Sequence, residues 1–242
     1  MPKPSLWAAT LFKEALIARG IKVEGEARRR DFRAAESDKF DPQKAFEIAQ
    51  QNSTALSEIV RHTNKESDNL YAELILRTLG KERGASAPDP DSRKNRARGD
   101  DEAGVAVIRS WLDRNSVATD DLAIHDGSGL SRLDLVTPEG TARLLVAISR
   151  TNSATAFRDS LPIAGRDGTL RGRLPREADR VFAKTGTLTN DHSLSGYAVR
   201  PDGEVLAFSI FCNDASEKTN PVRIIDRIAT LIAESGSAAA AK

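Results

Sequence analysis

Apolar residues recur every three or four positions along much of the chain, the pattern of helices that bury one face. The helices predicted from this pattern cover residues 5–19, 56–60, 70–79, 105–112, 137–148 and about 220–234. Gly20 and Gly80 are expected to end the first and third helices. Thr137 is expected to cap the fifth, because Pro138 follows at a position that needs no backbone donor. The last helix is predicted to bury Val222, Ile225, Ile228, Ala229 and Ile232.

After Pro162 the pattern changes to short apolar segments separated by turns. Strands are predicted over residues 180–188, 193–200 and 205–212. The turn at 201–203 joins the last two, which indicates an antiparallel meander. A helical region followed by a meander indicates an α+β fold, with an antiparallel sheet flanked by helices. The segment 81–101 is rich in charged residues, Gly and Pro, which is typical of a surface loop.

The composition excludes several classes of protein. Lys and Arg number 36 against 35 Asp and Glu, so a formal net charge of +1 gives no global attraction to nucleic acid or an anionic membrane. No apolar stretch approaches the ~20 residues needed to cross a bilayer, and the first residues lack the apolar core of a secretion signal. The lone Cys212 cannot form an intrachain disulfide. His62, His125 and His192 lack metal-ligand spacing, so neither a metal site nor another cofactor is predicted.

A first candidate motif, Ser67-Asp68-Asn69, lies in the polar break between two predicted helices. At this place the Ser67 hydroxyl and the Asn69 amide can both face a cleft. The alternative interpretation is that Ser67 or Asp68 only caps the following helix.

A second candidate motif, Lys184-Thr185-Gly186-Thr187, enters the first predicted strand. Lys184 can supply a positive charge and the threonines can supply hydroxyls for a carboxylate. Gly186 has no side chain, so an extended substrate backbone can approach the strand. The alternative interpretation is an exposed strand lysine beside a turn.

Class A β-lactamases and penicillin-binding proteins share three motifs: Ser-x-x-Lys, Ser-Asp-Asn and Lys-Thr-Gly. This chain contains the last two of them, in the same order. Four longer stretches, at 64–73, 125–132, 161–170 and 183–197, make the resemblance more specific. With them, the chain resembles the D-alanyl-D-alanine carboxypeptidase/endopeptidase family typified by penicillin-binding protein 4 over about residues 6–234. Within these stretches, residues 126–129 are interpreted as a structural turn and residues 166–169 as a loop.

The resemblance implies a penicillin-binding or serine β-lactamase-like fold, of which this chain would hold the three carboxyl-terminal strands and a helical region. It implies that residues 1–36 are the end of an inserted region with a linker. Residues 37–234 would be the carboxyl-terminal part of a transpeptidase-like domain, and 235–242 a disordered tail. It also implies a periplasmic or cell-envelope location, although these residues contain no signal peptide.

One departure from the family pattern concerns the nucleophile, because no Ser in the chain is followed by Lys three residues later. In a complete enzyme, the resemblance implies an acyl-enzyme formed with a peptidoglycan stem peptide or a β-lactam. Ser67 would relay a proton, Asn69 would hold the substrate amide, and Lys184 would polarise Ser67. The substrate-binding residues implied in this way are Thr185, Gly186 and Thr187.

Three functional hypotheses compete. The first is a serine-type D-Ala-D-Ala carboxypeptidase or endopeptidase, and the second is a catalytically inactive fragment or a peptidoglycan-peptide binding module. Nucleic-acid binding through the arginine runs at 28–33 and 93–98 is disfavoured, because acids surround both runs. The first hypothesis predicts that Ser67 and Lys184 converge in one cleft. The resemblance also implies that the strand at 205–212 pairs, in the family's five-stranded sheet, with a strand absent from this chain, so it is expected to leave an open sheet edge through which the chain can self-associate.

Overall fold

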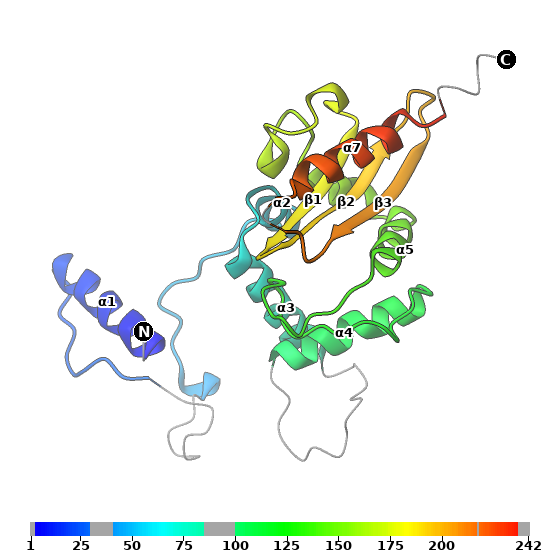
Figure 1. Ribbon diagram of the computed structural model, residues 1–242. Coiled ribbons are helices and arrows are strands. Elements are labelled where there is room, and N and C mark those ends of the chain that lie inside the picture. The colour runs from blue at the N-terminus through cyan, green and yellow to red at the C-terminus, as the bar shows by residue number, and fades with distance from the viewer. Residues whose placement is uncertain (1–2, 30–40, 85–99, 217, 237–242) are drawn as a thin grey trace. The chain divides into compact units, whose positions relative to one another are not determined.

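The computed structural model describes residues 3–29, 41–84, 100–216 and 218–236 (Figure 1). The chain divides into two compact units, residues 1–53 and 54–242. The domain boundary predicted between residues 36 and 37 lies outside the described residues, as does most of the predicted loop at 81–101.

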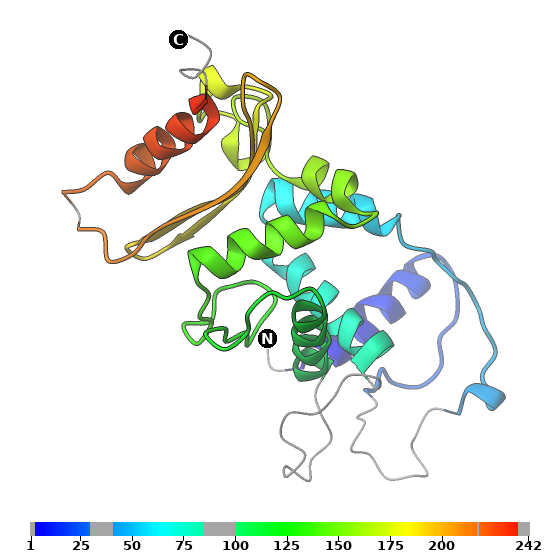
Figure 2. The same cartoon turned by 90° about the vertical axis from the view of Figure 1, so that its right-hand side faces the viewer.

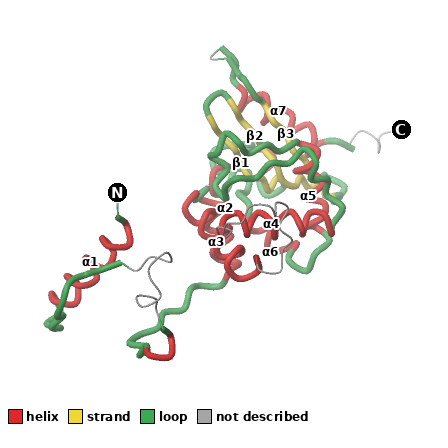
Figure 3. Tube along the Cα trace, turned by 90° about the horizontal axis from the view of Figure 1, so that it is seen from below, coloured by secondary structure: helices red, strands yellow, loops and turns green. Residues whose placement is uncertain are grey.

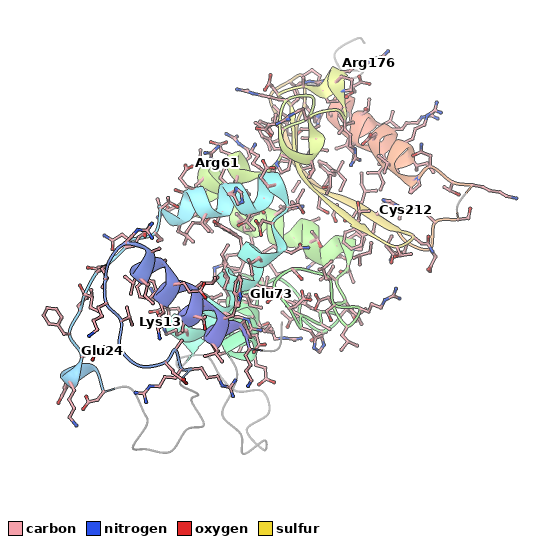
Figure 4. All side chains as sticks on the ribbon, turned by 90° about the vertical axis from the view of Figure 1, so that its left-hand side faces the viewer. Lys13, Glu24, Arg61, Glu73, Arg176 and Cys212 are labelled. Atoms are coloured by element: carbon pink, nitrogen blue, oxygen red, sulfur yellow. The ribbon has the colours of Figure 1, made fainter. Side chains whose placement is uncertain are left out.

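The first unit contains the helix α1 (Pro4–Ala18) and a short 3₁₀ turn, η2 (Pro42–Lys44). The helix predicted over residues 5–19 is confirmed, and Gly20 follows it with a φ of 80°, a conformation that favours glycine. The Lys13 ammonium donates a hydrogen bond to the Gly25 carbonyl and so ties the segment after α1 to the helix (Figure 4).

The second unit is built from helices and one sheet. Its α-helices are α2 (Leu56–Glu66), α3 (Asn69–Arg83), α4 (Asp100–Arg114), α5 (Pro138–Ser149), α6 (Ala154–Ser160) and α7 (Pro221–Glu234). Two 3₁₀ turns are η4 (Gly168–Leu170) and η5 (Pro175–Glu177). Every predicted helix is confirmed, but α6, with 7 residues, is too short to show a helical period and was not predicted. None of the helices in the described part of the chain is long and apolar enough to cross a bilayer.

The prediction that Gly80 ends a helix is wrong, because α3 continues through it to Arg83. Gly80 is buried inside the helix. Helices α3 and α4 pack closely along each other, and small residues allow this approach. A Cβ on Gly84 would lie 2.6 Å from the Ala103 Cβ on α4. Helix α3 ends one turn later, where Gly84 forms its C-cap and its N–H donates to the Gly80 carbonyl.

The sheet contains the strands β1 (Val181–Leu188), β2 (Asp191–Val199) and β3 (Val205–Cys212). They pair antiparallel in the order β1-β2-β3, so the predicted meander is confirmed. Helix α7 covers one face of the sheet, and α5 packs on the other (Figure 2). Viewed from below, α2, α4 and α6 also lie on the side opposite α7 (Figure 3).

Two apolar clusters hold these layers together. The cluster under α7 consists of Ala164, Leu170, Leu174, Val181, Ala183, Leu194, Ala198, Phe208, Ile225, Ala229 and Ala233. The cluster on the other face joins Tyr197 of β2 to Leu145 of α5 and to Leu161. Alternation along a strand places Lys184 on the same face as Phe182, which packs against this second cluster. Lys184 therefore points towards the helices on the side opposite α7.

One predicted core position in α7 is wrong. Ile225 and Ala229 are buried as predicted, whereas Ile228 is 38% exposed. With Ile224 and Leu231, Ile228 forms an exposed apolar stripe on the outer side of the helix. The apolar residues of α7 recur with a helical period, but they form a face that is wider than the part covered by the sheet.

Gly196 of β2 allows the close pairing of β1 and β2. It is the register partner of Ala183, and a Cβ there would overlap the Phe182 carbonyl oxygen and lie 2.6 Å from the Ala183 Cα. Gly196→Ala is expected to lower the free energy of unfolding by about 2–3 kcal/mol, because β1 must shift. The matched control, Gly172→Ala, has no atom within 4 Å of its new Cβ, so its free energy of unfolding should change by less than about 0.5 kcal/mol. Urea unfolding measures both, and equal effects of the two variants would contradict this view.

Candidate active site

Ser67 lies at the junction of α2 and α3. It adopts a left-handed conformation, with φ 57° and ψ 49°, and its backbone N–H donates to the Thr63 carbonyl. The next residue, Asp68, caps α3 by accepting a hydrogen bond of 3.0 Å from the Tyr71 N–H. This hydrogen bond is the main reason that the pKa of Asp68 lies below its ordinary value. Since Asp68 provides the cap, the Ser67 hydroxyl is available for another contact.

That contact is with Lys184, 117 residues further along the chain. The Lys184 ammonium donates to the Ser67 Oγ at 2.8 Å and to the Thr185 carbonyl at 2.9 Å. The predicted convergence of Ser67 and Lys184 is confirmed.

Burial lowers the pKa of Lys184 from its ordinary value of 10.5. Its deprotonated form is therefore easier to reach than that of a lysine in water. A lysine in this state can pass a proton to and from the serine hydroxyl that it contacts.

All six candidate site residues line one cleft of about 1140 Å³. The α2–α3 junction contributes Ser67 and Asn69 to this cleft, and β1 contributes Lys184, Thr185, Gly186 and Thr187. Gly186 stands opposite Ser193 of β2, whose hydroxyl a Cβ on Gly186 would overlap. The cleft therefore presents a cation, several hydroxyls and an amide side by side.

The turn at residues 126–129 also lines this cleft. The Asp126 carboxylate accepts from the Gly129 N–H at 2.6 Å and from the Ser131 N–H at 2.8 Å, which confirms the predicted hydrogen-bonded turn. Although burial opposes it, these two hydrogen bonds hold the pKa of Asp126 below its ordinary value. Glu73 of α3 accepts from the Gly127 N–H at 3.1 Å and fixes the turn to the helix (Figure 4). Sequence reasoning missed the position of the turn in the cleft wall, because its hydrogen bonds are equally typical of a surface turn.

The sequence profile of the D-Ala-D-Ala carboxypeptidase 3 (S13) family matches residues 1–235. The chain belongs to this family. The family resemblance drawn from the two motifs is thereby confirmed.

Curated proteins from several organisms are similar to this chain. A D-alanyl-D-alanine carboxypeptidase of Actinomadura sp. (strain R39) is 35% identical over 239 residues, which are 96% of this chain and 41% of the relative. The D-alanyl-D-alanine carboxypeptidase DacB of Haemophilus influenzae is 30% identical over 182 residues, or 72% of this chain and 35% of the relative. The chain thus spans less than half the length of these relatives.

Solved structures confirm the predicted fold. Penicillin-binding protein 4 from Haemophilus influenzae, complexed with a β-lactam, superposes with a TM-score of 0.76 at 25% identity. This match covers 94% of the S13 chain and 51% of that protein. The TLA-3 extended-spectrum β-lactamase superposes with a TM-score of 0.52 at 18% identity, over 74% of this chain and 64% of that protein, which shows a likeness of fold alone.

The histidines of the S13 chain lie in separate surroundings. His62 Nε2 stands 3.4 Å from a carboxylate oxygen of Asp68, and His192 lines the cleft with its Nδ1 buried and without a hydrogen-bond partner. Across residues 3–29, 41–84, 100–216 and 218–236, no group of three or more His, Cys, Asp or Glu side chains could hold a metal ion.

Proposed function

We propose that this chain supplies one half of the catalytic site of a serine-type D-Ala-D-Ala carboxypeptidase or endopeptidase that acts on peptidoglycan stem peptides. The observation that carries the proposal is the 2.8 Å hydrogen bond from the Lys184 ammonium to the Ser67 hydroxyl, within a cleft bordered by β1. Peptidoglycan lies outside the cytoplasmic membrane, so the proposed location is the cell envelope.

The proposed chemistry proceeds through an acyl-enzyme. A serine nucleophile gives its proton to the lysine that partners it in the family motif, its oxygen attacks the carbonyl carbon between the last two D-alanines, and the C–N bond to the terminal D-alanine breaks. Ser67 relays that proton from the lysine to the leaving amine while Lys184 holds and polarises the Ser67 hydroxyl. Water then hydrolyses the ester, which frees the serine and the shortened peptide.

Substrate binding in this proposal relies on β1. The terminal carboxylate pairs with the Lys184 ammonium and accepts hydrogen bonds from the hydroxyls of Thr185 and Thr187. The backbone N–H of Thr187 donates to the developing oxyanion. Asn69 holds the substrate amide from the other side of the cleft. Burial disfavours the charged form of Lys184, and the negative charge of a bound carboxylate would offset this cost.

In this first candidate function, the nucleophile comes from a segment outside residues 1–242. None of the serines in the sequence has the lysine partner three residues later that the family motif requires. The same observation favours a second candidate function, in which the chain binds a peptidoglycan peptide through β1 without cleaving it. The two candidates differ in whether a nucleophile-bearing segment completes the cleft.

A hybrid protein distinguishes these functions. It joins this chain to the portion of the Actinomadura relative that lies outside their match. The hybrid is expected to release D-alanine from a peptide ending in D-Ala-D-Ala, and Ser67→Ala or Lys184→Ala should each lower kcat about 10³-fold. Ser57→Ala and Lys81→Ala, at exposed positions of α2 and α3, are the matched controls and should leave kcat unchanged.

Intact-mass spectrometry after exposure to benzylpenicillin shows whether the hybrid has formed its nucleophilic site. The proposed roles would be contradicted by a hybrid that takes up benzylpenicillin covalently and still releases D-alanine at the same rate after Ser67→Ala or Lys184→Ala. A hybrid that melts cooperatively, binds the peptide and neither takes the label nor releases D-alanine would favour the binding module.

A further inference from the structure

A buried lysine lies two residues before Ser67. Lys65, near the end of α2, is 9% exposed. Its ammonium donates to the Leu161 carbonyl at 2.6 Å and to the two carboxylate oxygens of Asp167 at 2.8 and 2.7 Å. A lysine that is removed from water in this way is costly unless all its donors are used, and these three contacts use them. Lys65 is therefore held in one place relative to residues 161–167.

The Asp167 carboxylate also fixes the segment to which it belongs. One of its oxygens accepts a hydrogen bond of 2.8 Å from the Ile163 N–H, so the carboxylate closes the turn between these residues. Gly168 follows with a φ of 53°, and a Cβ there would lie 2.8 Å from the Lys65 carbonyl. The segment thus lies directly against the backbone of α2.

The same segment is hydrogen-bonded to β1 on its other side. The Ala164 N–H donates to the Val181 carbonyl at 2.9 Å, and the Ala183 N–H donates to the Pro162 carbonyl at 2.9 Å. The second of these bonds ends at the residue immediately before Lys184. Helix α2 packs against α6 and η4, and η4 packs against β1, so residues 161–170 bridge the two elements that carry Ser67 and Lys184.

We propose that Lys65 and Asp167 are positioning residues whose ion pair clamps α2 to the 161–167 segment and thereby holds the Ser67 hydroxyl against the Lys184 ammonium. The meaning of this clamp for catalysis rests on the proposed function, whereas the clamp itself is a property of this chain. Ser67 and Lys184 belong to different elements, so their contact depends on how firmly α2 is held relative to β1. Displacing a catalytic group by ~1 Å can slow a reaction by about 10²-fold.

The titration of Lys184 in the 242-residue chain tests the clamp without any need for turnover. Trace labelling with acetic anhydride over a pH series, followed by mass spectrometry of the peptide that contains Lys184, gives its titration midpoint. Burial lowers the pKa of Lys184 in the intact protein. Loosening of α2 should let water reach the ammonium, so the midpoint is expected to rise towards the ordinary 10.5 in both Lys65→Met and Asp167→Asn.

The pair of variants separates positioning from a direct effect of charge. Lys65→Met leaves a negative Asp167, and Asp167→Asn leaves a positive Lys65, so charge alone would move the Lys184 midpoint in opposite directions. A rise in both variants supports the clamp. The charged or titratable side chains that line the cleft are unaltered in both: Asp68, Asp126, Arg132, Asp134, Asp191 and His192.

A matched control uses the ion pair next to the clamp. Arg166 pairs with Asp179 at 2.8 Å, and both side chains are more than 60% exposed. Arg166→Gln should leave the titration midpoint of Lys184 unchanged. Lys65→Arg keeps the positive charge and the hydrogen-bond donors, so its Lys184 midpoint should stay close to the wild-type value.

The decisive result is the direction of the shift in Asp167→Asn. A folded Asp167→Asn protein with an unchanged or lower Lys184 midpoint would overturn the proposal. Circular dichroism establishes the fold of each variant. If Lys65→Met does not fold, Asp167→Asn still decides the matter, because the Asp167 side chain is 33% exposed and less dependent on burial. Failure of the hybrid to release D-alanine would count against the proposed function and leave this titration result standing.

Discussion

Incubation of the isolated 242-residue chain with benzylpenicillin is expected to leave its intact mass unchanged. A stable adduct requires a serine that a neighbouring base has activated, and no serine in the sequence has the lysine partner of the family motif. The one candidate within the cleft that contacts a lysine is Ser67, whose Oγ accepts a hydrogen bond from Lys184. We assign this serine to proton relay, so it should not become acylated.

The hybrid described above provides the positive control, with an expected gain of one drug mass per chain. A stoichiometric gain in the isolated chain would contradict the proposed division of the site. Ser67→Ala then identifies the atom involved: if it abolishes the gain, Ser67 is itself the nucleophile. If the gain persists in Ser67→Ala, another residue of the chain is the nucleophile.

Concentration-dependent association of the isolated chain is the second large effect that we expect. Among the described residues, β3 lies at the end of the sheet and pairs only with β2. Unpaired N–H and C=O groups along such an edge favour pairing with another chain. Phe208 of β3 is buried in the apolar cluster with residues of α7, which holds the strand in the sheet. We therefore propose that two copies, or one copy and a completing segment, pair along Val205–Cys212.

Sedimentation velocity over a hundredfold range of concentration measures this association. Val205→Lys places a charge on the edge strand at a residue that is 48% exposed, and should weaken association about tenfold. Ile17→Lys, at a residue of α1 that is 52% exposed, adds the same charge elsewhere and should not. A monomer at every concentration, with slow amide exchange along both sides of β3, would show that something within the chain already covers this edge.

The sequence alone determined most of the secondary structure and the family. Helices with an apolar period and a meander with turn residues between its strands are local properties, so neighbouring residues suffice to predict them. The cap at Thr137 was predictable for the same reason, and its hydroxyl accepts the Gly140 N–H at 3.0 Å. The two motifs, together with the stretches at 64–73, 125–132, 161–170 and 183–197, identified the family, because the residue types and order of the motifs are rare in combination.

The tertiary structure decided the contacts and the burial that no local pattern encodes, although the family resemblance had predicted that Ser67 and Lys184 meet. No local pattern relates Ser67 to Lys184, or Lys65 to Asp167, because each contact joins segments about a hundred residues apart. Gly80 is buried and Ile228 remains 38% exposed, because burial depends on the element that packs against a position, which the sequence near that position does not encode. The lowered pKa of Lys184 has the same origin: it results from the water that the surrounding elements exclude, and those elements come together only in the folded chain.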